Sequence, residues 1–239
     1  FGNTVWDGNL QATHIDNFDL RWELFQKKGQ TVAVSAFYKA FDKPIEIVQF
    51  VQAPNNFQPR NVGNGKVYGI EVELRKNLGF VSSVLEEFSL NTNVTVTESS
   101  IEMSNTEYQA RLTKARDGET IKNTRSMAGQ APYIVNAGLS YKGEKNGLDV
   151  GVFYNVQGET LAYVGISDRP DVYAVPFHSV NMSINKSFGV EEKLQLGLTV
   201  ANMLNDNREL VYKSFNASNQ YFSKLSPGSS FNLKVGYKF

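Results

Sequence analysis

Apolar and polar residues alternate with a period of two along most of this chain. The clearest example is the last segment, where the odd positions from Phe231 to Phe239 are apolar and the even positions are polar or glycine. Strict alternation of this kind predicts β-strands that have one apolar and one polar face. The same pattern predicts further strands around residues 18–24, 32–38, 68–74, 88–96, 133–141, 148–156, 180–184 and 194–200.

The predicted strands are long. We expect about nine of them with roughly 9–13 residues each, whereas a tilted membrane-crossing strand needs ~9–11 residues and a soluble strand usually has ~5–6. The fold class predicted from this length is an all-β, antiparallel, up-and-down transmembrane β-barrel. A soluble β-sandwich that binds a ligand is the alternative, because it would also use strands with one apolar face.

The connections between the predicted strands alternate between short and long. The short ones cover residues 27–30, 77–83, 142–146 and 189–192. The long ones are polar and cover residues 47–66, 101–131, 158–175 and 205–227. Transmembrane barrels place short turns at the periplasmic end and long loops at the extracellular end, so this alternation favours a membrane barrel over a sandwich.

Charged residues in the strand cores occupy the polar face. A Lys or Arg that faces lipid near the bilayer centre costs ~2–4 kcal/mol, whereas a charge that faces a wet lumen costs little. We therefore predict a lumen-facing polar ladder, which consists of Arg21, Glu23, Glu71, Glu73 and Arg75.

Composition narrows the possible functions. The chain has 24 basic and 24 acidic residues, two histidines and no cysteine, which gives no electrostatic reason to expect a nucleic-acid partner. The histidines, His14 and His178, lie near strand ends and do not form a catalytic constellation with a neighbouring residue. We expect no enzymatic activity, no cofactor and no metal site.

The last predicted strand resembles the assembly signal of bacterial outer-membrane proteins. That signal consists of alternating apolar residues and a terminal aromatic residue, and the barrel assembly machinery reads it. The corresponding residues here are Phe231, Leu233, Val235, Tyr237 and Phe239. The resemblance implies that the C-terminus is native and that the machinery is a partner.

Four further blocks resemble the TonB-dependent receptors of Bacteroidota. One of them, "NVGNGKVYGIEVELRKNLG", contains a Tyr-Gly-Ile-Glu core, and another closes with Lys-x-x-x-x-Pro-Ile-Glu. The four blocks cover residues 14–46, 61–79, 127–141 and 151–159. The resemblance implies an outer-membrane location and the uptake of a scarce nutrient.

Such receptors have a 22-stranded barrel that encloses an N-terminal plug, and TonB contacts a segment ahead of the plug. About nine strands is an odd number, whereas bacterial single-chain barrels have even numbers. We therefore expect residues 1–239 to be the C-terminal portion of a larger barrel, with the plug domain and the N-terminal strands absent. TonB would act through that absent region, and outer-membrane lipid and a surface lipoprotein are further candidate partners. A passive porin-like or structural barrel subunit of a surface complex is the alternative function.

Ligand contacts in such a protein are expected in the long loops. The loop at residues 103–130 is rich in basic residues, among them Arg111, Arg116 and Arg125, which would attract an anion. The loop at residues 205–224 carries aromatic residues that could stack on a ligand, namely Tyr212, Phe215 and Tyr221. The sequence leaves open whether these residues bind a ligand, pack on a partner or are simply solvated.

Overall fold

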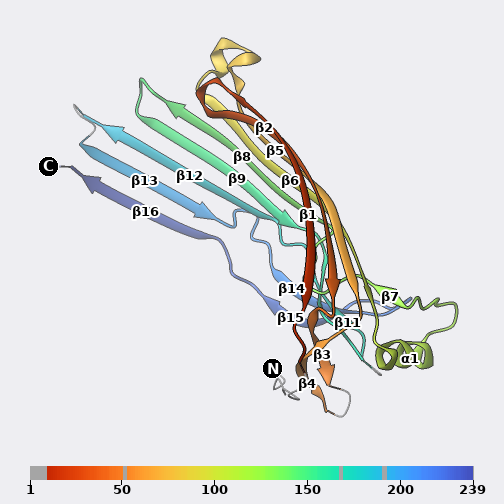
Figure 1. Cartoon of the computed structure of the whole chain (residues 1–239). Coiled ribbons are helices and arrows are strands. Elements are labelled where there is room, and N and C mark those ends of the chain that lie inside the picture. Colours follow the sequence, from red (N-terminus) through yellow and green to blue (C-terminus); the bar gives the residue numbers. More distant parts are fainter. Residues whose placement is uncertain (1–9, 51–52, 167–168, 190–192, 239) are drawn as a thin grey trace.

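A computed structural model describes residues 10–50, 53–166, 169–189 and 193–238. Antiparallel strands make up most of this part of the chain (Figure 1). In the same residues, no helix is long and apolar enough to cross a membrane. Phe239, the terminal aromatic residue of the expected assembly signal, lies outside the described residues.

One large antiparallel sheet forms a curved wall (Figure 1). Its described strands follow each other in chain order, with a short strand β7 (Thr124–Arg125) added beside β6. Along the wall the order is β1 (His14–Gln26), β2 (Gln30–Asp42), β5 (Gly65–Asn77), β6 (Phe88–Glu102), β8 (Tyr133–Gly143), β9 (Leu148–Gln157), β12 (Ser179–Phe188), β13 (Leu194–Ala201) and β16 (Ser230–Tyr237). Each of the nine segments with alternating residues therefore corresponds to one strand of the wall. The prediction of an up-and-down barrel wall is confirmed.

The register brings the apolar positions of neighbouring strands into common rows. One such row crosses six strands and contains Trp22, Val34, Val72, Val94, Val135 and Val156. The apolar face stays exposed over much of its area, as Leu20 and Leu233 show with about three quarters of their surface open. A wide exposed apolar face in a well-ordered sheet is the surface that a barrel presents to lipid.

The described short connections lie at one end of the wall (Figure 1). η1 (Lys27–Gly29) joins β1 to β2, and residues 144–147 join β8 to β9. Residues 78–87, which contain η2 (Leu78–Phe80) and η3 (Ser83–Leu85), join β5 to β6. The link between β12 and β13 lies partly outside the described residues.

The long connections have their own secondary structure, which the alternation of residues did not predict. β3 (Ile45–Phe50) and β4 (Ala53–Asn61) form a hairpin, and α1 (Asn105–Lys114) follows β6. The third and fourth long connections join in a separate four-stranded sheet. In order, this sheet contains β10 (Thr160–Tyr163), β11 (Asp171–Ala174), β14 (Arg208–Lys213) and β15 (Gln220–Leu225).

The buried apolar cores of the described residues lie at the loop end of the wall. One contains Val48, Leu161, Val164 and Ile166, which come from the first and third long connections. The other contains Val62, Val67, Ile101 and Met127, and Phe37 and Phe41 pack against it. A β-sandwich would bury the apolar faces of its long strands against each other. Here those faces stay open, so the sandwich alternative is wrong.

Candidate functional site

A cavity of about 580 Å³ opens among the long loops. Its walls come from α1 and the segment after it, from the connection between β10 and β11, and from the end of β14. The residues that line it are largely polar. They are Arg111, Lys114, Arg116, Glu119, Ile121, Glu159, Gly165, Arg169, Pro170, Asp171, Tyr173, Lys213, Ser214 and Phe215.

The cavity carries an excess of positive charge, with five cationic side chains against three carboxylates. Lys213 pairs with Glu159 at 2.6 Å. Arg116 donates a hydrogen bond to the carbonyl oxygen of Phe215 at 3.1 Å, and this contact leaves its charge unneutralised. Within the described part of the chain, no carboxylate forms an ion pair with Lys114 or Arg169. Since these three cations keep their charge, the cavity can attract an anion.

A chain of five charged side chains, which we call the ion network, supports one wall of this cavity. Its members alternate in sign and are Glu46, Arg125, Glu107, Arg111 and Asp171. They come from β3, β7, α1 and β11, so the network ties the first three long connections together.

Arg125 is the more buried of the two cations in the ion network. Its guanidinium lies 2.6 Å from a carboxylate oxygen of Glu46 and 2.7 Å from one of Glu107. All three side chains are buried, with exposed fractions of 8%, 3% and 2%. The second oxygen of Glu46 accepts a hydrogen bond from the backbone N–H of Ala128 at 2.7 Å. The two carboxylates therefore have partners despite their burial, which an isolated buried charge would lack.

Arg111 joins the buried network to the cavity surface. It donates to both oxygens of Asp171, at 2.8 and 3.0 Å, and to Glu107 four residues earlier on α1 at 3.0 Å. Burial by itself would lower the pKa of Arg111, but Asp171 and Glu107 outweigh it and raise the pKa. The Arg111 guanidinium is therefore a fixed cation whose donors are largely occupied by the protein.

The position of Glu107 follows from the way α1 begins. Ser104 is the N-cap, and its hydroxyl accepts a hydrogen bond from the backbone N–H of Glu107 at 3.2 Å. A Ser three residues ahead of a Glu is a common signature of a helix start. Glu107 then sits in the first helical turn, where the helix dipole favours a negative charge.

Tyr173 adds a neutral hydrogen-bonding group to the cavity wall. Burial and the neighbouring Asp171 raise its pKa to about 12. Its hydroxyl therefore stays protonated at any physiological pH. Lys213 lies 5.5 Å from the centre of its ring, so this wall presents an aromatic ring beside cations.

An aromatic cluster ties the four-stranded sheet to the first hairpin. Phe57 lies 5.0 Å from Tyr163, and Phe222 lies 5.6 Å from Tyr163 and 5.4 Å from Tyr212, measured between ring centres. The contributing strands are β4, β10, β14 and β15. Together with the ion network, this cluster joins all four long connections into one packed cap.

The predicted ligand-loop residues lie in four different places. Arg111, Arg116 and Phe215 line the cavity. Arg125 lies inside the ion network and Tyr212 inside the aromatic cluster, so both hold the loops in position. Tyr221 is exposed, and its hydroxyl donates to Glu209 at 3.4 Å.

The predicted polar ladder lies on one face of the wall. Arg21 pairs with Glu23 at 2.6 Å and, across two strand boundaries, with Glu73 at 2.9 Å. Glu71 accepts a hydrogen bond from Asn93. These side chains are about a third exposed, so their pairs add little to stability and chiefly make the face polar. Arg75 lines a hollow further along the same face.

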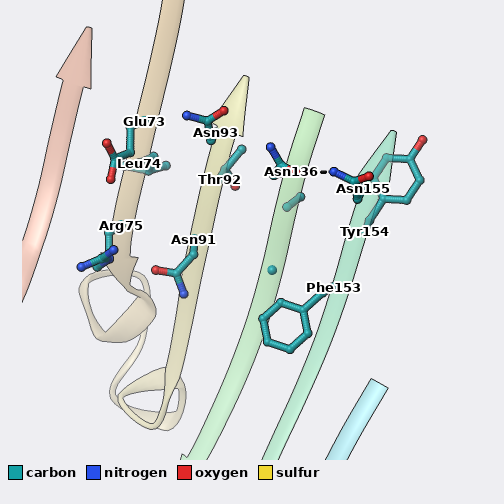
Figure 2. A pocket seen from close by; sticks show the side chains of 12 residues that line it. Glu73, Leu74, Arg75, Asn91, Thr92, Asn93, Asn136, Phe153, Tyr154 and Asn155 are labelled. Carbon is teal, nitrogen blue, oxygen red and sulfur yellow. Dashed lines mark hydrogen bonds between the residues drawn. The ribbon is translucent and has the colours of Figure 1, made fainter. Parts of the chain in front are cut away.

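That hollow, of about 460 Å³, lies on the polar face between β5 and β9 (Figure 2). Asparagines from neighbouring strands line it, and Asn155 donates a hydrogen bond to Asn136. Phe153 lies over Gly138 and Gly151. A Cβ atom at either glycine would come within 2.7 Å of the Phe153 ring. The glycines thus let an aromatic ring lie flat against the sheet among amide side chains.

Sequence reasoning missed Glu46, Glu107 and Asp171 as members of a site. Two signals were present. Ser104 and Glu107 have the spacing of a helix cap, and Glu107 and Arg111 have the spacing of an ion pair on one helix face. The pairing with Glu46 had no local signal, because 79 positions separate it from Arg125.

The geometry of wall and loops defines a class of protein. Long meandering strands have an exposed apolar face and a polar face, with short links at one end and packed loops at the other, as in the wall of a transmembrane β-barrel. The family described as "TonB dependent receptor-like, beta-barrel" has a model that matches residues 1–203. The chain belongs to this family, whose members are outer-membrane barrels.

Solved structures of iron transporters are similar in fold. The ferric citrate transporter FecA is 14% identical with a TM-score of 0.64, and the match covers 94% of this chain and 31% of that one. The FrpB iron transporter from Neisseria meningitidis is 15% identical with a TM-score of 0.59, with 99% and 33% covered. A ferric enterobactin receptor mutant from Pseudomonas aeruginosa is 16% identical with a TM-score of 0.55, with 96% and 32% covered.

The chain spans about a third of the length of these structures. Among curated proteins, none matches the sequence. The resemblance to the Bacteroidota branch of the family stays a prediction.

Proposed function

We propose that this chain supplies part of the wall and of the extracellular loop face of a TonB-dependent transporter that takes up an anionic nutrient. The observation that carries the proposal is the loop cavity, in which cations outnumber carboxylates. Family membership supports transport across the outer membrane. The rest of the barrel, the plug and the segment that contacts TonB would come from a part of the protein outside these 239 residues.

An anionic iron chelate is the ligand class that we favour. The similar structures include a transporter of ferric citrate and a receptor for ferric enterobactin, both named for iron chelates. Lys114, Arg116 and Arg169 would contact the negative groups of the chelate, and Phe215 would pack against its carbon skeleton. Arg111 would add to the positive field, and Tyr221 would stand at the rim.

Two partners belong to the same proposal. The barrel assembly machinery would read the alternating residues of β16, among them Phe231, Leu233, Val235 and Tyr237. A surface lipoprotein would find its contacts on the packed loop cap rather than on the wall, because the wall faces lipid and lumen.

Ligand binding to isolated outer membranes tests the proposal. Arg116→Glu is expected to weaken the binding of ferric citrate at least tenfold, because it reverses a charge in the cavity and a charge-assisted contact is worth ~1.5–3 kcal/mol. Lys122→Glu is the matched control, because Lys122 is exposed in the same loop and does not line the cavity. Equal binding by both variants would place the ligand elsewhere.

Energy dependence separates active transport from a passive pore. Uptake of labelled ferric citrate by cells should stop when a protonophore collapses the proton gradient. Uptake that continues at the same rate would support the passive barrel instead.

A further inference from the structure

The connection at residues 78–87, which we call the β5–β6 turn, exposes three apolar side chains. Phe80, Val81 and Val84 have exposed fractions of 69%, 64% and 81%. The turn lies beyond the end of the wall, on the side of the short links (Figure 1). Adjacent apolar side chains that stay exposed in an ordered segment mark an interaction surface.

The other described short links are different in composition. Residues 27–29 are Lys-Lys-Gly, and residues 144–147 are Glu-Lys-Asn-Gly. Either link reverses the chain with polar residues and glycine, as a turn in water requires. The β5–β6 turn is longer and apolar, so chain reversal alone does not explain its composition.

Local hydrogen bonds hold the β5–β6 turn in one shape. The backbone N–H of Gly79 donates to the side chain of Asn77 at 2.9 Å. The N–H of Val81 donates to the carbonyl of Leu78 at 3.0 Å, and the N–H of Leu85 donates to that of Ser82 at 2.9 Å. Several backbone groups of the turn are therefore hydrogen-bonded without burial of the apolar side chains, which remain available to a partner.

Lys76 shows which way the turn faces. The alternation along β5 places Lys76 on the apolar face with Val72 and Leu74, and its ammonium lies 5.5 Å from the centre of the Phe80 ring. Phe80 therefore lies beside the short-link end of the lipid-facing surface, and not beside the lumen-facing surface.

The length of the apolar face of β5 also indicates the depth of the turn relative to the bilayer. It ends in Lys66 on one side and Lys76 on the other, ten positions apart. At ~3.4 Å per residue and a tilt of ~45°, ten positions correspond to ~24 Å of depth, close to the ~25 Å apolar band of a barrel. Lys76 thus marks the boundary of that band, and the turn begins at the height of the lipid headgroups.

A second lysine repeats this arrangement. Lys186 occupies the apolar face of β12 near its short-link end, and its ammonium lies 5.5 Å from the centre of the Phe188 ring. Lysines at a membrane boundary lay their methylene groups along apolar surface and keep the ammonium near the headgroups, where aromatic rings also gather. Two such lysine–aromatic pairs at the same end of the wall indicate that this end lies at the membrane–water interface.

We propose that the β5–β6 turn is a membrane anchor that inserts Phe80, Val81 and Val84 into the interfacial layer of the phospholipid leaflet at the periplasmic end of the barrel. The partner is the bilayer itself, and the apolar surface of the turn continues the lipid-facing surface of the wall. Lys76 would bind a lipid phosphate at the point where turn and wall meet.

Spin labelling in bilayers tests the proposal on the intact protein. The 239 residues contain no cysteine, so Val84→Cys gives a single label in this chain, with any cysteine elsewhere replaced by serine. Collisions of the nitroxide are measured with oxygen, which concentrates in lipid, and with a nickel chelate, which stays in water. Val96→Cys on the lipid-facing surface of β6 and Lys145→Cys in the polar turn between β8 and β9 are the two references.

The label at position 84 is expected to prefer oxygen, as the label at 96 does. Adding Phe80→Ser should shift it toward the nickel chelate. Preference for the chelate, as at 145, would overturn the proposal, because the turn would then lie in water. Protection from both reagents would also overturn it, since a protein would then cover the turn. A heat-dependent shift on a detergent gel verifies folding, and Val81→Cys replaces Val84→Cys if that variant does not fold.

Discussion

Removal of the Arg125 side chain should release the loop cap while the barrel wall stays intact. In Arg125→Met, the buried carboxylate of Glu46 loses the cation that lies 2.6 Å from it, whereas Glu107 keeps its pair with Arg111. Removing one partner of a buried ion pair costs ~3–5 kcal/mol, because the remaining charge is uncompensated. At ~1.4 kcal/mol per factor of ten, the loops should open at least about a hundred times more often.

Hydrogen exchange measures this opening. The amides of α1 and β7 should exchange about two orders of magnitude faster in Arg125→Met than in the wild type, and those of β6 and β8 should not change. Lys122→Met is the matched control, because it removes an exposed cation three residues away. The double variant Arg125→Met/Glu46→Gln should recover part of the protection, since it removes the stranded charge of Glu46.

Unchanged exchange of α1 in Arg125→Met would refute this reasoning. It would mean that the apolar cluster around Val48 and Leu161, with the aromatic rings beside it, holds the loops without the ion network. Faster exchange throughout the wall would refute it in another way, because the loop network would then be a determinant of barrel stability.

Three further predictions test the wall and the cavity. Val96→Lys should lower the free energy of unfolding in bilayers by ~2–4 kcal/mol, and Thr95→Lys on the polar face should lower it far less; equal effects in a urea titration would contradict the assignment of the faces. Gly138→Ala should cost ~1–3 kcal/mol in the same titration, because its Cβ would displace the ring of Phe153, and Phe153→Ala should remove most of that cost. Tyr173 should ionise near pH 12, above its ordinary value of 10, so its contribution to stability persists below pH 10 and is lost as the pH rises through 12. The difference between the phenolate absorbance titrations of the wild type and Tyr173→Phe measures this ionisation. A difference step near pH 10 would contradict the burial of the ring.

The wall could be predicted from the sequence because its information is local. Successive residues of a strand face lipid and lumen in turn, so the two faces of β5 or β16 follow from a few neighbouring residues. The alternation of short and long links then orients the sheet. Alternation limits the register of β16 against β13 to shifts by an even number of residues, and in the observed register each apolar row continues across the boundary.

The loop cap could not be predicted in the same way. Its strands are two to nine residues long and carry no clean alternation, so the polarity of these segments suggested connections without secondary structure. The ion network pairs Glu46 with Arg125 and Arg111 with Asp171, residues that are 79 and 60 positions apart. Arg125 shows the consequence most clearly. A basic residue in a polar loop was interpreted as a candidate ligand contact, but it is buried between Glu107 of the same loop and Glu46 of a distant segment.

The wall and the four-stranded sheet of the cap differ in how far apart in the chain their paired residues lie. In the wall, β1 pairs with β2 and β8 with β9 through short links, so each pairing closes a small loop of chain. In the cap, β11 pairs with β14 across the whole of β12 and β13. Closing a longer loop costs more entropy before any contact forms, so low contact order favours the wall. The wall can therefore form hairpin by hairpin, and β11 and β14 are expected to pair after the β12–β13 hairpin that lies between them in the chain.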